Sequence, residues 1–60
     1  MEHALSSLAV WMEYGRAARG NPSEFVWLWA NYVRQSGYST EQNRLAALDA
    51  FNKGGANGSL

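Results

Sequence analysis

Four aromatic side chains fall within ten residues of this chain, in the stretch EFVWLWANYV from Glu24 to Val33. A domain of about 60 residues buries only about 60% of the surface that its unfolded form exposes, so it needs dense packing or a further constraint. The chain has no cysteine and a single histidine, His3, which excludes disulfides and leaves no zinc ligand set. We therefore expect no metal and no cofactor, and stability that comes from aromatic packing and self-association.

A first helix is predicted over residues 2–18, because apolar side chains recur there on one face at about 100° per residue. Gly15 falls on that apolar face, where glycine costs about 1 kcal/mol relative to alanine. Gly15 therefore either lets a second helix approach closely or is a weak point near the end of the helix.

A second helix, residues 22–36, has the clearest boundary signals. Asn21 supplies a capping side chain, Pro22 suits the first helical position, and Glu24 lies three residues after the cap. Gly37 can take the left-handed conformation that ends a helix. These signals fix both ends of the helix to within a residue or two.

A third helix, residues 40–53, begins at Ser39 or Thr40 and carries an apolar stripe that includes Phe51. The glycine-rich residues 54–60 that follow are predicted to form a flexible tail. The sequence thus predicts an all-α fold, a small three-helix domain or short helical bundle. Because so small a domain lacks buried area, we expect it to form a homodimer.

The charges balance, with five Lys and Arg against five Asp and Glu. Most of them lie in the first or last turn of a predicted helix, with the sign that the helix dipole favours. Three pairs also have the spacing of ion pairs on a helix: Glu13 with Arg16, Glu41 with Arg44, and Asp49 with Lys53. Fold stability accounts for these charges, and no nucleophile, base or phosphate-binding loop stands out, so we expect no enzyme.

The longest apolar run, Phe25 to Ala30, is too short to span a bilayer. The N-terminal residues lack the basic region and long apolar run of a secretory signal. A helix lying on a membrane surface would need several Lys or Arg on its polar face, whereas residues 22–36 contain one arginine. We expect a cytoplasmic protein that does not associate with membranes.

A helix-turn-helix built from the second and third helices is the alternative interpretation. Gly37 suits the turn of such a motif. Ser36 and Asn43, however, stand where the motif normally buries apolar side chains, and no basic excess is present to make phosphate contacts. Nucleic acid is therefore the less favoured partner, and a small DNA-binding transcriptional regulator is the alternative function.

The aromatic side chains of the second helix divide into two sets. Phe25, Trp29 and Tyr32 share one face, whereas Trp27 points away from it. That face is expected to form the core with Leu5, Leu8, Trp11 and Met12 of the first helix and Leu48 and Phe51 of the third. Trp27 is then either a surface contact residue, a core residue of a central helix, or part of a contact with a second copy. Trp, Tyr and Arg dominate interface energies, so we predict a partner-binding patch around it. Its members are Trp27, Arg34, Asn31, Glu24, Val10 and Tyr14.

No family motif occurs in the chain. Its small size, its lack of cysteine and of a catalytic set, and its large aromatic faces are similar in kind to small phage-encoded proteins that block a host machine. These include anti-CRISPR proteins and inhibitors of transcription or pili. The resemblance implies a viral inhibitor that occludes a partner surface, and it assigns no residue a role. We predict a non-enzymatic protein–protein interaction module.

Overall fold

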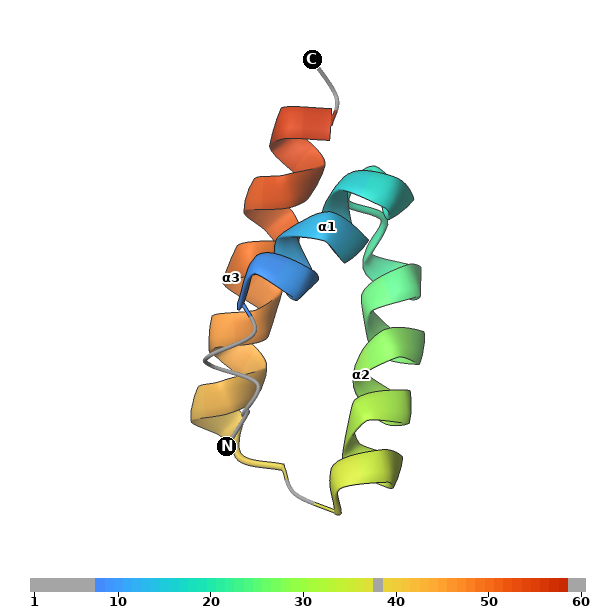
Figure 1. Cartoon of the computed structure of the whole chain (residues 1–60), viewed down its shortest axis with the longest axis vertical. Coiled ribbons are helices and arrows are strands. Elements are labelled where there is room, and N and C mark those ends of the chain that lie inside the picture. Colours follow the sequence, from blue (N-terminus) through green and yellow to red (C-terminus); the bar gives the residue numbers. More distant parts are fainter. Residues whose placement is uncertain (1–7, 38, 59–60) are drawn as a thin grey trace.

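The computed structural model describes residues 8–37 and 39–58, which form three helices: α1 (Leu8–Ala18), α2 (Pro22–Ser36) and α3 (Glu41–Gly58). No strand occurs within these ranges, so the all-α prediction is confirmed. Figure 1 shows α2 and α3 running in opposite directions along the long axis, while α1 lies across α3 and leads into the start of α2. None of the described helices is long and apolar enough to cross a membrane.

The two ends of α2 lie where the capping signals place them. Asn21 is extended, with φ −67° and ψ 116°, and its Oδ1 accepts a hydrogen bond of 3.0 Å from the Ser23 N–H. Gly37 is left-handed, with φ 66° and ψ 24°, and its N–H donates to the Val33 carbonyl at 2.7 Å. Local chemistry alone therefore defines this helix.

A tight turn joins α1 to α2. Arg19 and Gly20 are both left-handed, with φ 56° and 73°, and the Gly20 N–H donates to the Gly15 carbonyl at 2.9 Å. Glycine adopts this conformation freely, whereas a residue with a Cβ loses about 1 kcal/mol in it. Arg19 is thus a strained position that the turn imposes.

The start of α3 is capped by Thr40, the second of the two predicted start positions. The Thr40 Oγ1 accepts a hydrogen bond of 3.1 Å from the Asn43 N–H, and its carbonyl accepts one of 3.0 Å from the Arg44 N–H. One side chain therefore satisfies a backbone N–H that the helix itself leaves without a partner.

Two of the three predicted ion pairs form, both on α3. An Arg44 Nη2 lies 2.7 Å from a Glu41 carboxylate oxygen, and the Lys53 Nζ lies 3.1 Å from an Asp49 carboxylate oxygen. The hydrogen bond from Arg44 lowers the pKa of Glu41, and the same bond raises the pKa of Arg44. Both pairs are exposed, so water and salt screen them and they contribute little to stability. The third pair, Glu13 with Arg16, does not form among the described residues.

The predicted flexible tail is wrong for residues 54–58, which form the last turns of α3. Gly54 and Gly55 are buried, Gly54 against α1 and Gly55 against the turn that follows α1. A Cβ added to Gly54 would lie 1.9 Å from the Met12 carbonyl oxygen, so only glycine permits this approach. Burial against α1 outweighs the low helix propensity of glycine, about 1 kcal/mol per residue. The rest of the predicted tail lies outside the described residues.

Gly15 makes the equivalent contact from the side of α1. A Cβ at Gly15 would lie 1.8 Å from the Phe51 carbonyl oxygen, and a Cβ at Gly55 would lie 2.5 Å from the Gly20 Cα. Of the two interpretations of Gly15, close helix approach is therefore the correct one. We call this backbone-to-backbone packing of α1 and the turn after it on α3 the glycine contact; its residues are Gly15, Gly20, Gly54 and Gly55.

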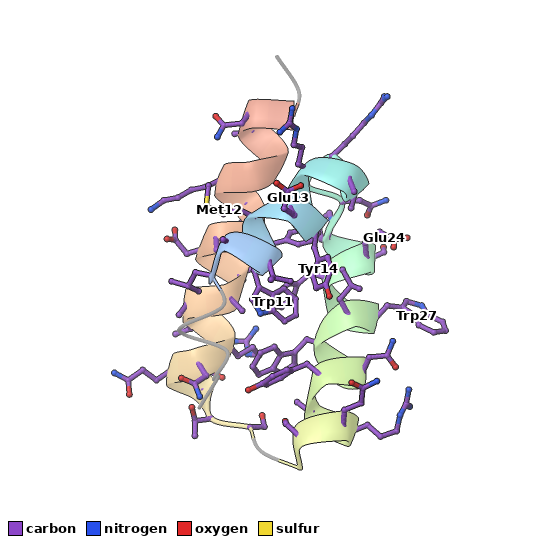
Figure 2. All side chains as sticks on the ribbon, viewed as in Figure 1. Trp11, Met12, Glu13, Tyr14, Glu24 and Trp27 are labelled. Carbon is purple, nitrogen blue, oxygen red and sulfur yellow. The ribbon has the colours of Figure 1, made fainter. Side chains whose placement is uncertain are left out.

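Helix α2 is held to the rest of the domain by aromatic rings instead of close backbone approach. The Trp11 ring lies 5.5 Å from the Phe25 ring and 5.8 Å from the Trp29 ring, between centroids. Phe25 in turn lies 5.4 Å from Phe51 of α3, in an edge-to-face arrangement. Figure 2 shows Trp11 projecting from α1 into the space between α2 and α3. These rings form a layer that separates α2 from the other two helices.

The predicted core residues are mostly confirmed, with one exception. Trp11, Phe25, Trp29 and Phe51 are buried, while Leu8, Tyr32 and Leu48 are partly buried against them. Met12 was expected in the core but is 38% exposed. Its backbone touches Gly54, so the two helices leave no room between them for its side chain. Leu5, also predicted in the core, lies outside the described residues.

Candidate interaction surface

Trp27 lies on the outer face of α2, opposite the aromatic layer. Its side chain is 71% exposed and that of Val26 is 66% exposed, the two largest values among the exposed large apolar side chains. Figure 2 shows Trp27 projecting away from α1 and α3. Trp27 is therefore not a core residue within this chain, which leaves contact with a partner or with a second copy.

A shallow depression surrounds the base of Trp27. Its volume is about 260 Å³. The Arg34 Nη2 donates a hydrogen bond to the Asn31 Oδ1, which ties together two polar side chains of its lining. We call this depression the α2 hollow; it is lined by Val26, Trp27, Ala30, Asn31 and Arg34.

Two further depressions lie between α1 and α2, and Tyr14 and Leu28 line both of them. We call the two together the α1–α2 groove. The part of about 330 Å³ is lined by Val10, Trp11, Tyr14, Leu28, Asn31, Tyr32 and Gln35. The part of about 400 Å³ is lined by Tyr14, Ala17, Ala18, Asn21, Glu24 and Leu28. Figure 2 shows Tyr14 directed from α1 toward α2.

The six residues of the predicted patch all line these depressions. Trp27 and Arg34 belong to the hollow, Val10, Tyr14 and Glu24 to the groove, and Asn31 to both. The hollow and the groove therefore adjoin at Asn31 and make one surface across α1 and α2. The sequence predicts the helix face on which each residue lies. It does not predict that α1 packs beside α2, and this packing brings the residues into one surface.

The predicted patch leaves out several apolar and amide side chains of this surface, among them Val26, Leu28 and Gln35. Val26 and Leu28 lie on the two flanks of the packing face of α2. Because the aromatic layer fills the space beneath α2, both flanks remain at the surface or at its edge. One sequence signal could have found them. The central stripe of α2 already carries several large rings, and these fill the core without the side chains on its flanks.

The surface offers groups suited to binding. It presents aromatic and aliphatic side chains, amides, one guanidinium from Arg34 and one carboxylate from Glu24. Among the described residues, no cluster of three or more His, Asp or Glu could hold a metal ion. The pKa shifts found at Glu41 and Arg44 belong to their ion pair on α3, outside the hollow and the groove.

A helix-turn-helix would present four side chains for base recognition: Thr40, Gln42, Asn43 and Arg44. Three of the four are engaged elsewhere. Asn43 is buried, Thr40 caps α3, and Arg44 is paired with Glu41. Figure 1 also shows α2 and α3 as an antiparallel pair, whereas the two helices of that motif cross at about 90–120°. The geometry does not favour the DNA-binding alternative.

Comparison of the chain with protein-family models, with curated protein sequences and with solved structures finds no match. The interpretation of this surface therefore rests on its residues and their geometry.

Proposed function

We propose that the chain is a non-enzymatic protein–protein interaction module that acts by covering a working surface of its partner. The observation that carries this proposal is Trp27, 71% exposed beside Arg34 on a surface that continues into the α1–α2 groove. Burying a tryptophan removes about 150–250 Å² of surface from water and so stabilises a fold. The domain does not obtain this stabilisation from Trp27, which stays exposed. Trp and Arg are also the residue types that most often dominate the energy of an interface.

Occlusion is the mode of action that suits the size of the domain. Its extents are 34 × 21 × 16 Å, so its broad face is of the same order as the roughly 800 Å² that each partner buries in a typical complex. A bound copy would then cover a substrate or docking site of the partner. We include in the proposal the class of inhibitor implied by the resemblance in kind, a phage-encoded protein directed at a cytoplasmic host protein.

Three variants test the proposal. Trp27→Ala and Tyr14→Ala remove contact residues of the hollow and the groove, and Leu45→Ala is the control, because Leu45 is 50% exposed on α3 outside both. A protein captured from cell extract by the wild type is purified, and its affinity for each variant is measured by calorimetry. We expect Trp27→Ala to raise the dissociation constant at least about thirtyfold and Leu45→Ala to change it less than threefold.

The activity of the captured partner provides the second measurement. Occlusion requires that this activity falls in proportion to the fraction of partner bound. The variants should therefore rank in the same order for inhibition as for affinity. Equal binding by all three variants, or binding without loss of activity, would contradict the proposal. A steep loss of affinity for duplex DNA with added salt would instead support the transcriptional regulator.

A further inference from the structure

We infer that the outer face of α2 pairs with the same face of a second copy of the chain, in an antiparallel twofold contact that seats each Trp27 in the α2 hollow of the other copy. The inference rests on the proposed function, because it assigns one part of the interaction surface to self-association. In the proposed function the same face of α2 serves the foreign partner, so that partner would displace the second copy from Trp27 and would also contact the α1–α2 groove.

The outer face of α2 forms a single stripe. Glu24, Trp27, Ala30, Asn31 and Arg34 follow one another at intervals that keep them on one side of a helix with about 100° per residue. Phe25 and Trp29 are buried on the opposite side. The fold therefore uses one side of α2 for the core and leaves this stripe in water.

The stripe contains both a projecting side chain and a site that can receive it. In closely packed helices, a side chain enters a hole formed by four residues of the facing helix at i, i+3, i+4 and i+7. Trp27, Ala30, Asn31 and Arg34 have this spacing, and all four line the hollow. Ala30 adds only a methyl group to that lining. A twofold contact requires that each copy supply both parts from the same patch, and this patch does so.

The charges select the direction and the register of the pair. Glu24 lies in the first turn of α2 and Arg34 in the last turn. In an antiparallel pair, Trp27 of one copy can lie opposite the middle of the hole that the other copy forms. In that register Glu24 of each copy lies opposite Arg34 of the other. A parallel pair would instead set like charges against each other. The shape of the hollow and the position of the charges thus lead independently to the same register.

Among the described residues, neither Glu24 nor Arg34 is paired with an opposite charge. Arg34 donates to the amide oxygen of Asn31, and no ion pair of Glu24 or Arg34 occurs among the described residues. The two side chains lie ten residues apart, about 15 Å along the helix axis, so they cannot reach each other on one helix. A guanidinium has five N–H donors, so Arg34 can keep Asn31 and also bind a carboxylate of the second copy.

The area involved predicts the strength of the dimer. Two tryptophans and the surfaces that they cover account for about 600–1,000 Å², which is below the lower limit of stable interfaces, about 1,200 Å². We therefore expect a dimer that dissociates at micromolar concentrations.

Sedimentation velocity on the full chain at concentrations from about 1 to 500 µM measures this equilibrium. We expect the wild type to pass from monomer to dimer over that range. Trp27→Ala should raise the dissociation constant about a hundredfold or more, because the dimer loses both tryptophans. Leu45→Ala, which changes an exposed side chain of α3, should leave it within threefold. Circular dichroism confirms that each variant keeps its helical content.

An exchange of charges tests the register itself. Glu24→Arg alone and Arg34→Glu alone each set like charges together at both ends of the pair, so each variant should dimerise at least about fivefold more weakly than the wild type. An equimolar mixture of the two variants restores both attractive contacts and should recover the dimer. The mixture also serves as the folding control. It contains the same two variant chains, so a recovered dimer shows that both are folded.

The inference is overturned by a wild type that stays monomeric throughout, by a dimer that Trp27→Ala leaves intact, or by a mixture that fails to recover. These results separate it from the proposed function. A monomeric wild type that still loses its foreign partner through Trp27→Ala overturns the dimer alone. A Trp27-dependent dimer that binds no other protein supports this inference and contradicts the proposed function.

Discussion

Replacement of Gly15 by alanine sets two effects of opposite sign against each other. Gly15 lies in the middle of α1, where alanine is favoured over glycine by about 1 kcal/mol in an isolated helix. Helix propensity alone therefore predicts that Gly15→Ala stabilises the protein. The glycine contact predicts the reverse, because the new Cβ would lie 1.8 Å from the Phe51 carbonyl oxygen.

The magnitude follows from how far the helices must move. Real Cβ atoms essentially never approach another heavy atom within 3.0 Å, and the Phe51 oxygen is backbone that cannot rotate away. The helices must therefore separate by roughly 1 Å or more, which also opens the contact between Gly54 and Met12. Overpacking of this kind costs about 1–3 kcal/mol and more when backbone must shift, so we expect a net loss of at least about 2 kcal/mol.

Thermal unfolding followed by circular dichroism at a fixed protein concentration measures this loss. For a domain of about 60–100 residues, 2 kcal/mol corresponds to a melting temperature lower by about 8–16 °C. Gly37→Ala is the matched control, because nothing lies within 4 Å of a Cβ there and only the left-handed backbone, φ 66°, opposes it. That control should lose about 1 kcal/mol. A Gly15→Ala protein as stable as the wild type, or more stable, would refute the glycine contact.

Three further predictions concern the turn and the third helix. Arg19→Gly should raise the free energy of unfolding by about 0.5–1 kcal/mol in urea denaturation, because it relieves the left-handed backbone at φ 56°; Arg19→Ala, which keeps a Cβ, should not. Thr40→Ala should lose about 1 kcal/mol with the cap of α3, whereas Ser39→Ala should change stability by less than about 0.5 kcal/mol. Because the folded state lowers the pKa of Glu41, its ion pair should stabilise the protein above the ordinary value of 4.5 and lose that effect as the pH falls through the lowered pKa. An NMR titration should show the Glu41 pKa returning to its ordinary value in Arg44→Ala, and an unchanged pKa would contradict the pairing.

The sequence predicts α2 well because the signals that define it are local. The Asn21 side chain reaches Ser23, and the Gly37 N–H reaches Val33, so both ends are set by residues within one turn. The outward direction of Trp27 follows in the same way from its angular position relative to Phe25.

The glycine contact could not be predicted because its partners are far apart in the sequence. Gly15 is recognisable on an apolar face, but nothing nearby indicates that Phe51 will lie against it. Gly54 and Gly55, taken alone, have the composition of a chain end that does not fold. Only when α1 and the turn after it cover them does the absence of a side chain become the property that keeps α3 helical to Gly58. The exposed position of Met12 has the same origin.

Backbone packing between α1 and α3 also determines where the large side chains lie. Because these two helices meet through glycine, few apolar side chains are needed between them, and the rings of Trp11, Phe25 and Trp29 are free to form the layer that carries α2. That layer completes the core without Trp27, the third tryptophan of the chain, which stays 71% exposed. The fold of one copy therefore does not depend on the side chain that the proposed association needs most. Substitution of Gly15 should lower the stability of the fold, and substitution of Trp27 should weaken association alone, so the two properties can be measured separately.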